Sequence, residues 1–325
     1  MARSAAQPYV DLEQEAPEED VAGQVREIEI LTRRLVADSL AGQYHAVFKG
    51  RGMSFDSVRE YQPGDDIRAI DWNVSARTGG VFVKQYVEER ELTVLIAVDL
   101  SGSQGFGTSA QTKRQLAARI AAILALSAIS NNDRVGLVLF SDHMERYLPP
   151  KKGRAHVLRV IQEVLTWRPQ GRGTRLDLAC DYISRIARKR AVVFVLSDFA
   201  SSGVVLPFQQ SAGQPASQRN GGYDRALGIL ARRHDVVPIV TRDPAESVWP
   251  DVGLVLLEDM ETGDQVWFDS GSSQARKQYA ELSRKEARLR DQTFRKYGLD
   301  PLEAVIGQDF LPSLAAFFRR RAARQ

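Results

Sequence analysis

The sequence predicts an α/β protein built on a doubly wound, mostly parallel sheet, and two observations support this. First, the apolar runs at 93–99, 135–140 and 192–197 are continuous rather than alternating, which is typical of strands buried on both faces. Second, helical patterns at 111–130 and 177–188 lie between these strands, with their apolar positions three and four residues apart. Strands that alternate with helices in this way form a parallel sheet covered on both sides.

The N-terminal part precedes this pattern. The first 22 residues are acidic and hold few large apolar side chains, so we expect a mobile tail. From Val25 to Leu40, apolar residues recur at helical spacing and predict an amphipathic helix. Residues 44–92 form a block punctuated by Gly and Arg, with a strand-like run at 81–87, which predicts a β-rich N-terminal brace.

The C-terminal part continues the alternation and then changes. Residues 201–223 are dominated by Ser, Gly, Gln and Asn, which indicates a flexible insertion. The elements expected along the rest of the sheet domain and beyond it are a helix at 155–165, a helix at 225–233, a strand at 236–240, a hairpin around Gly263, a charged helix at 274–296, a short strand at 304–306 and a final helix ending at Arg321. The predicted segments are therefore a tail at 1–22, a helix and brace at 23–91, the sheet domain at 92–258, and a hairpin with C-terminal helices at 259–325 that packs on it.

Charge and composition exclude several function classes. The chain has 44 Lys and Arg against 41 Asp and Glu, a net charge of +3, but the first thirty residues alone carry eight acids and two bases. The basic runs lack the interleaved aromatic residues of a base-stacking surface, so we expect no nucleic-acid partner. No P-loop or Rossmann glycine pattern occurs, which argues against ATP hydrolysis by this chain.

Cysteine and histidine usage narrows the location and the metal chemistry. Cys180 is the only cysteine and lies at helical spacing from Leu176 and Ile183, so we expect a core residue and no disulfide. The four histidines show no zinc-site spacing. With no signal peptide and no apolar stretch long enough to span a bilayer, we expect a cytoplasmic protein with no transmembrane segment, and a peripheral membrane contact stays open.

Polar side chains follow the predicted strands at positions where a doubly wound sheet binds ligands. Asp99, Ser101 and Ser103 come directly after the first buried strand, Thr174 precedes a later helix, and Asp198 ends the strand at 192–197. Because the carboxyl ends of parallel strands meet at one edge, these two carboxylates and three hydroxyls are expected to converge. The alternative is that Asp99 and the serines only cap the next helix.

A second constellation lies within residues 59–77. Its members are charged or aromatic and comprise Arg59, Tyr61, Asp65, Asp66, Arg68, Asp71, Trp72 and Arg77. We expect Arg68, Asp71 and Arg77 to pair inside a brace anchored by Tyr61 and Trp72. A partner surface is the alternative, since an Arg pairs equally well with a carboxylate of another protein.

These two constellations carry a family resemblance. The Asp99-x-Ser101-x-Ser103 loop, Thr174 and Asp198 are similar to the metal-ion-dependent adhesion site of von Willebrand factor A (vWA) domains. Residues 59–72, with Ser75-Ala76-Arg77, resemble the signature of the DUF58 family, vWA-like proteins often encoded beside MoxR-type AAA+ ATPases. The resemblance extends over residues 42–310 through Gly136–Ser141 and Glu261-Thr262-Gly263.

The resemblance implies a fold of the vWA type and a function in protein interaction. Ser101, Ser103 and Thr174 would supply neutral oxygens to Mg²⁺, with Mn²⁺ and Ca²⁺ as alternatives, while Asp99 and Asp198 act mainly through water or by orienting the hydroxyls. The open coordination position would take an Asp or Glu of a partner. The implied partners are a MoxR-type AAA+ ATPase and an acidic client protein, in the assembly or activation of other complexes, without catalysis by this chain.

Two other functions compete with this interpretation. One is a Mg²⁺-dependent phosphohydrolase with Asp99 as nucleophile, although Ser101 stands where such enzymes carry an acid–base aspartate. The other is a metal-free scaffold that binds its partner through residues 44–92. A further hypothesis is that the acidic N-terminal arm competes with the partner for the metal site or for a basic face.

Overall fold

The fold is described from a computed structural model, which covers residues 23, 25–30, 44, 47–48, 52–89, 91–105, 112–200, 222–258, 263 and 265–324. The expected tail at 1–22 and nearly all of the expected insertion at 201–223 lie outside the described residues. Within the described part, no helix has the length and apolar character needed to cross a membrane.

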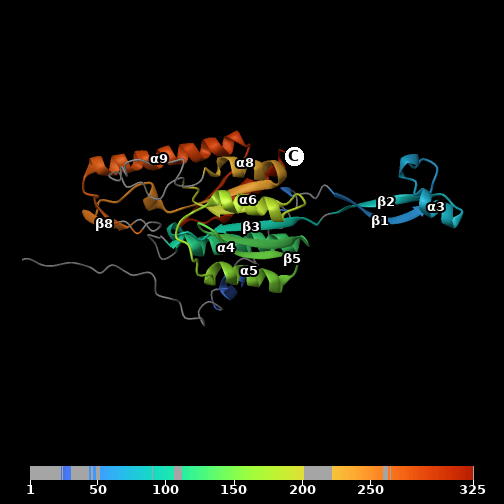
Figure 1. Cartoon of the computed structure of the whole chain (residues 1–325), viewed down its shortest axis with the longest axis horizontal. Coiled ribbons are helices and arrows are strands. Elements are labelled where there is room, and N and C mark those ends of the chain that lie inside the picture. The colour runs from blue at the N-terminus through green and yellow to red at the C-terminus, as the bar shows by residue number, and fades with distance from the viewer. Residues whose placement is uncertain are drawn as a thin grey trace, which may run out of the picture.

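A six-stranded sheet forms the centre of the protein and confirms the predicted fold class (Figure 1). Its members are β3 (Thr93–Asp99), β4 (Arg134–Phe140), β5 (Met144–Lys151), β6 (Val192–Ser197), β7 (Asp235–Arg242) and β10 (Leu302–Val305), in the spatial order β10-β7-β6-β3-β4-β5. All neighbours are parallel except β5, which runs antiparallel to β4. The chain moves outward from β3 to β4 and β5 and then returns to β6 on the other side of β3. The strand order therefore reverses between β3 and β6, which is where a sheet of this kind opens a binding crevice.

Helices cover both faces of the sheet (Figure 1). On one face lie α4 (Lys113–Ser130), α5 (Arg154–Thr166) and α10 (Leu311–Ala322), and on the other lie α6 (Leu176–Ile186), α8 (Tyr223–Arg233) and the end of the long α9 (Ser273–Lys296). Alternate residues of each central strand enter different cores: in β3, Ile96 packs with the first group and Ala97 with the second. Both are fully buried. This two-sided burial explains why the strand sequences are continuously apolar.

The C-terminal segment belongs to the sheet domain more closely than the expected boundary at 258/259 implies. That boundary divides a hairpin, because β8 (Leu254–Glu258) pairs with β9 (Gln265–Asp269). Further along, β10 adds an edge strand beside β7, and Phe317 and Phe318 of α10 are fully buried in the core on the α4 side. Residues 302–324 therefore complete the sheet and one of its cores instead of packing on a finished domain.

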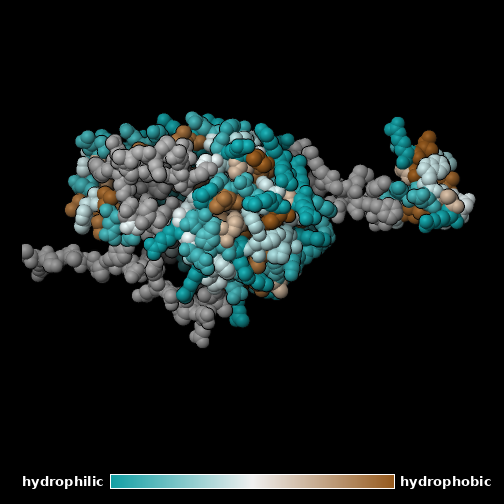
Figure 2. Space-filling model, in the orientation of Figure 1, coloured by the Kyte–Doolittle hydropathy of each residue, from teal (hydrophilic) through white to brown (hydrophobic). Residues whose placement is uncertain are grey.

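The N-terminal block forms a long antiparallel hairpin that projects from the body (Figure 1). It consists of β1 (Gly52–Glu60) and β2 (Phe82–Glu89), with the 3₁₀ turn η2 (Ile67–Ala69) and the short helix α3 (Trp72–Thr78) at its far end. Its strands join the body at the amino end of β3. Apolar side chains gather on the tip of this hairpin (Figure 2), where Ile67 is 69% exposed and Trp72 is 68% exposed.

Two details of the hairpin differ from the expected brace. The strong ion pair joins Arg59 to Asp65 through two hydrogen bonds of 2.7 Å, and the guanidinium lowers the pKa of Asp65 to about 2. Asp71 pairs with neither Arg68 nor Arg77, because its Oδ1 accepts from Asn73 N and Val74 N to cap α3, and its Oδ2 lies 3.8 Å from Lys84. An exposed Trp72 cannot anchor a core, so the expectation of a Trp72-anchored brace was wrong. Local turn chemistry, which needs no burial, holds this tip together.

Candidate functional site

Asp99 ties the end of β3 to the neighbouring strand. Its Oδ1 accepts a hydrogen bond from Ser101 N at 2.9 Å, and its Oδ2 accepts one from the Ser197 hydroxyl at 2.7 Å. Asp99 is 1% exposed, so both carboxylate oxygens are used inside the protein. The side chain thus fixes the turn that carries the two serines and aligns it with the end of β6.

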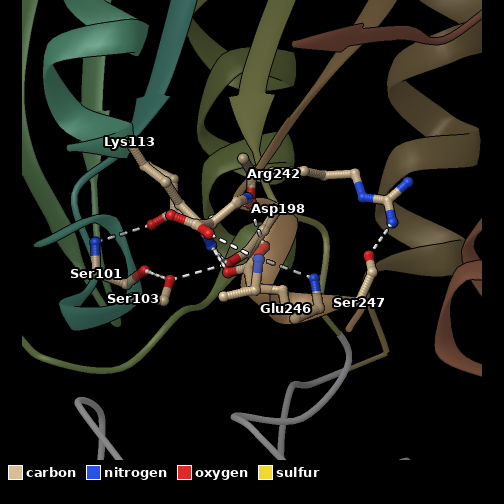
Figure 3. A network of polar contacts seen from close by, with 12 residues as sticks. Ser101, Ser103, Lys113, Asp198, Arg242, Glu246 and Ser247 are labelled. Carbon is tan, nitrogen blue, oxygen red and sulfur yellow. Dashed lines mark hydrogen bonds and ion pairs between the residues drawn. The ribbon is translucent and has the colours of Figure 1, made fainter. Parts of the chain in front are cut away.

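The two serine hydroxyls lead from this turn to Asp198 (Figure 3). Ser101 Oγ and Ser103 Oγ are 3.1 Å apart, and Ser103 Oγ donates to Asp198 Oδ2 at 2.9 Å. The other oxygen of Asp198 accepts from Ala200 N at 3.1 Å, which holds the carboxylate at the end of β6. The structure therefore brings four of the five sequence-predicted residues into one connected group at the point where strand order reverses.

The fifth residue, Thr174, lies at the same edge of the sheet. Its loop is attached to the serine turn because Gly102 N donates to the carbonyl of Arg172 at 2.8 Å. Thr174 is 7% exposed and lines a narrow cleft together with Ser197 and Tyr223. The Thr174 loop therefore lies beside the serine turn, and the role of its hydroxyl as a ligand stays a prediction.

A carboxylate that the sequence analysis did not identify holds the Thr174 loop. Glu145 of β5 accepts from the Ser141 hydroxyl at 2.7 Å, from Trp167 Nε1 at 3.2 Å, and from the backbone amides of Gln170 and Gly171 at 2.9 and 3.1 Å. Its side chain is 1% exposed. Burial alone would raise the pKa of Glu145, but these donors favour the ionised form and the pKa is lowered overall. The sequence feature that could have identified Glu145 is a single acidic residue in an edge strand that shows little alternation of apolar and polar residues.

A buried ammonium group also belongs to the site. Lys113 is the first residue of α4, its side chain is fully buried, and its Nζ lies 3.2 Å from Asp198 Oδ2, the same oxygen that accepts from Ser103 (Figure 3). Lys113 also forms an ion pair with Glu246. The sequence held a signal for this arrangement, because a cation in the first turn of a helix opposes the helix dipole and needs carboxylates nearby.

Glu246 comes from a third strand end. It closes the 3₁₀ turn η4 (Pro244–Glu246) after β7, where its Oε2 accepts from Asp243 N at 3.0 Å in a capping box. That bond leaves Oε1 directed at Lys113. The site therefore draws side chains from the carboxyl ends of β3, β6 and β7, while residues 59–77 of the hairpin lie at the opposite end of β3 and take no part in it.

Burial and like charges set the electrostatics of this group. Burial, reinforced by the negative charge of Asp198, raises the pKa of Asp99 above its ordinary value. Burial also disfavours the ionised form of Asp198, but the nearby Lys113 ammonium outweighs it and the pKa of Asp198 is lowered. For Lys113, burial is outweighed by the charges of Asp198 and Glu246, and its pKa is raised. Lys113 is therefore charged at neutral pH.

The donor set suits a hard divalent cation. Neighbouring ligands of an octahedral Mg²⁺ are about 3 Å apart, and the Ser101–Ser103 and Ser103–Asp198 oxygen separations are 3.1 and 2.9 Å. Asp198 and Glu246 face the single charge of Lys113. Burial raises the pKa of Asp99 to about 7 and also raises the pKa of Glu246. A net charge of two negatives is therefore reached only when all three carboxylates are ionised, a state that a bound cation would favour. In the described part of the chain, no cluster of three or more His, Cys, Asp or Glu side chains is arranged to hold a metal. A cation at this edge would therefore rely on hydroxyl oxygens.

Comparisons with known proteins agree with the sequence resemblance. An uncharacterized protein of Mycobacterium tuberculosis and one of Mycobacterium bovis are each 30% identical to this chain over 314 residues, covering 93% of this chain and 91% of theirs. The uncharacterized protein YeaD of Bacillus subtilis is 26% identical over 133 residues, covering 41% of this chain and 29% of its own length.

Two solved structures with which this chain shares a low level of similarity are a BatB protein and a VWA domain. The conserved hypothetical protein BatB of Bacteroides thetaiotaomicron is 14% identical with a TM-score of 0.43, over 72% of this chain and all of BatB. The SpRpn10 VWA domain is 12% identical with a TM-score of 0.35, over 69% of this chain and 93% of that domain. The family model for DUF58, described as a protein of unknown function, matches residues 57–289, which is well over half of the chain, and the chain belongs to this family.

Proposed function

We propose that this DUF58 protein is a metal-dependent interaction module that captures a carboxylate of a partner protein. The observation that carries the proposal is the connected group Ser101, Ser103 and Asp198, formed from two strand ends at the reversal of strand order. Mg²⁺ coordinated directly by neutral hydroxyls would attract an external anion more strongly than Mg²⁺ coordinated by carboxylates, even where nearby carboxylates contribute to the charge balance. Thr174 would be the third hydroxyl of this set.

The environment of Asp99 supports binding over turnover. A nucleophilic aspartate needs an oxygen that can reach the substrate. Here one oxygen of Asp99 accepts from Ser101 N and the other from the Ser197 hydroxyl, and the residue is 1% exposed. This arrangement favours Asp99 as a residue that orients the serine turn, so the phosphohydrolase hypothesis has less support.

The proposed partners follow from the family resemblance. DUF58 proteins of this type are often encoded beside MoxR-type AAA+ ATPases, so the proposed complex contains such an ATPase and an acidic client that it assembles or activates. A carboxylate on either protein would complete the coordination of the metal. Mn²⁺ and Ca²⁺ are the alternative ions, and they differ from Mg²⁺ in preferred distance and coordination number.

The test is capture of the AAA+ ATPase from the same genome by the immobilised chain, with Mg²⁺ or with EDTA. We expect retention with Mg²⁺, loss with EDTA, and loss in the double variant Ser101→Ala plus Ser103→Ala. Ser57→Ala, which removes a hydroxyl from the hairpin, is the matched control and is expected to bind normally. Capture that is insensitive to both EDTA and the double substitution would remove the metal from the proposal and favour a scaffold function.

A further inference from the structure

The buried ammonium of Lys113 is unusual for a cation site. Burying a lysine is costly unless carboxylates surround it. Asp198 and Glu246 surround it here. The Lys113 Nζ lies 3.2 Å from Asp198 Oδ2 and is in direct contact with Glu246 Oε1. The side chain of Glu246 is 26% exposed and is held by the capping box of η4. The chain thus places a fixed positive charge beside one of the carboxylates proposed to attract a divalent cation.

The position of this charge has a direct consequence for the site. Asp198 Oδ2 accepts from Ser103 and is also the oxygen nearest to Lys113. A cation that approaches this oxygen is repelled by the ammonium. The repulsion is offset by Glu246, whose Oε1 contacts the same ammonium. The ionised pair is neutral as a whole, so the charge that faces a cation comes from Asp198 and, when it is ionised, from Asp99.

We infer that the Lys113–Glu246 pair determines the affinity of the site for divalent cations: Lys113 weakens binding, and Glu246 restores it by balancing Lys113. This inference rests on the proposed function. It assigns a role in cation affinity to two residues outside the expected ligand set. It also predicts opposite changes in affinity when the charge of one or the other is removed. Removing the charge of Glu246 makes the site less negative by one charge, whereas removing the charge of Lys113 makes it more negative by one charge.

The experiment is a double-mutant cycle on Mn²⁺ binding, measured by electron paramagnetic resonance on the full chain. Glu246→Gln is expected to weaken binding about tenfold or more, and Lys113→Met to tighten it by a similar factor. The double variant Lys113→Met plus Glu246→Gln restores the charge of the site and is expected to bind within about threefold of the unmodified chain. Asp181→Asn, which removes an exposed carboxylate from α6, is the control for a general charge effect and is expected to leave binding unchanged.

The outcomes separate this inference from the proposed function. If the unmodified chain binds Mn²⁺ but the two single variants change affinity in the same direction or not at all, the inference is overturned and the metal site stands. If the unmodified chain binds no Mn²⁺ at millimolar concentration, both are overturned. Thermal unfolding without metal checks folding: each single variant leaves one charge unbalanced and is expected to melt below the double variant. A double variant that melts below both single variants would contradict the pairing itself.

Discussion

The hydroxyl of Ser103 donates to Asp198 Oδ2 at 2.9 Å, across a sequence separation of 95 residues. This bond joins the turn after β3 to the end of β6, and Ser101 lies 3.1 Å further along the same chain of oxygens. Replacing both serines by alanine removes two of the proposed cation ligands and leaves the bonds of Asp99 to Ser101 N and Ser197 in place.

We therefore expect the double variant Ser101→Ala plus Ser103→Ala to lose Mn²⁺ affinity by about tenfold to a hundredfold while remaining folded. Calorimetric titration measures the affinity, and circular dichroism checks the fold. Unchanged affinity in a folded double variant would exclude the serine hydroxyls as ligands.

Glu145 gives a stability prediction. Its buried carboxylate accepts four hydrogen bonds around the Thr174 loop, and Gln in its place can satisfy only part of these donors. Glu145→Gln is expected to lower the free energy of unfolding by about 1–3 kcal/mol at neutral pH. Urea denaturation measures this, and an unchanged midpoint would contradict the role given to Glu145.

The pH dependence of that difference follows from the lowered pKa of Glu145. A carboxyl whose pKa is lower in the folded chain stabilises it fully above the unfolded value, which is about 4.3 for Glu. The stabilisation is lost as the pH falls from that value through the folded pKa. The gap between the unmodified chain and Glu145→Gln should therefore narrow as the pH falls below about 4.3. A gap that widens in acid would give the opposite sign and refute the assignment.

Two glycines of the Thr174 loop make a matched pair. A Cβ on Gly171 would overlap Asp142 Oδ1 and lie 2.5 Å from Ser141 Oγ, whereas a Cβ on Gly173 would lie 3.5 Å from its nearest neighbour, Asp142 Cβ. Gly171→Ala is therefore expected to displace the loop, lower the melting temperature and weaken Mn²⁺ binding, while Gly173→Ala is tolerated. Equal behaviour of the two variants would show that the close approach at Gly171 does not constrain the loop.

Cys180 offers a probe of the core on the α6 side of the sheet. The thiol is 1% exposed, and burial raises its pKa, so the reactive thiolate is scarce in the folded chain. We expect no reaction with a thiol-specific chromogenic reagent under native conditions and stoichiometric reaction in denaturant. Rapid labelling of the native protein would mean that the core around Cys180 opens readily.

The sequence predicts the parts of the site that depend on local spacing. Asp99, Ser101 and Ser103 lie within one turn after a continuous apolar strand, and Asp198 ends another such strand, so strand order alone brings them together. Both interior strands are identifiable because two-sided burial removes polar residues from them.

The residues that the sequence does not reveal depend on contacts between distant elements. The place of Lys113 in the first turn of α4 indicates that it needs a carboxylate nearby, but no local pattern identifies Glu246 as its partner, because their ion pair requires the start of α4 to meet the turn after β7. Glu145 lies in β5, an edge strand with two prolines and little alternation, so neither the strand nor its buried acid is apparent. The sequence predicts a short strand at 304–306, but its place at the edge of the sheet beside β7 is not apparent, because β10 has only four residues.

The projecting hairpin has a consequence for the separation between two parts of the protein. It enters at the amino end of β3, whereas Asp99 and the serines stand at the carboxyl end of the same strand. Seven extended residues span about 20 Å, and the hairpin tip that carries α3 lies further out still (Figure 1). The tip and the serine turn are therefore too far apart for one small ligand to contact both.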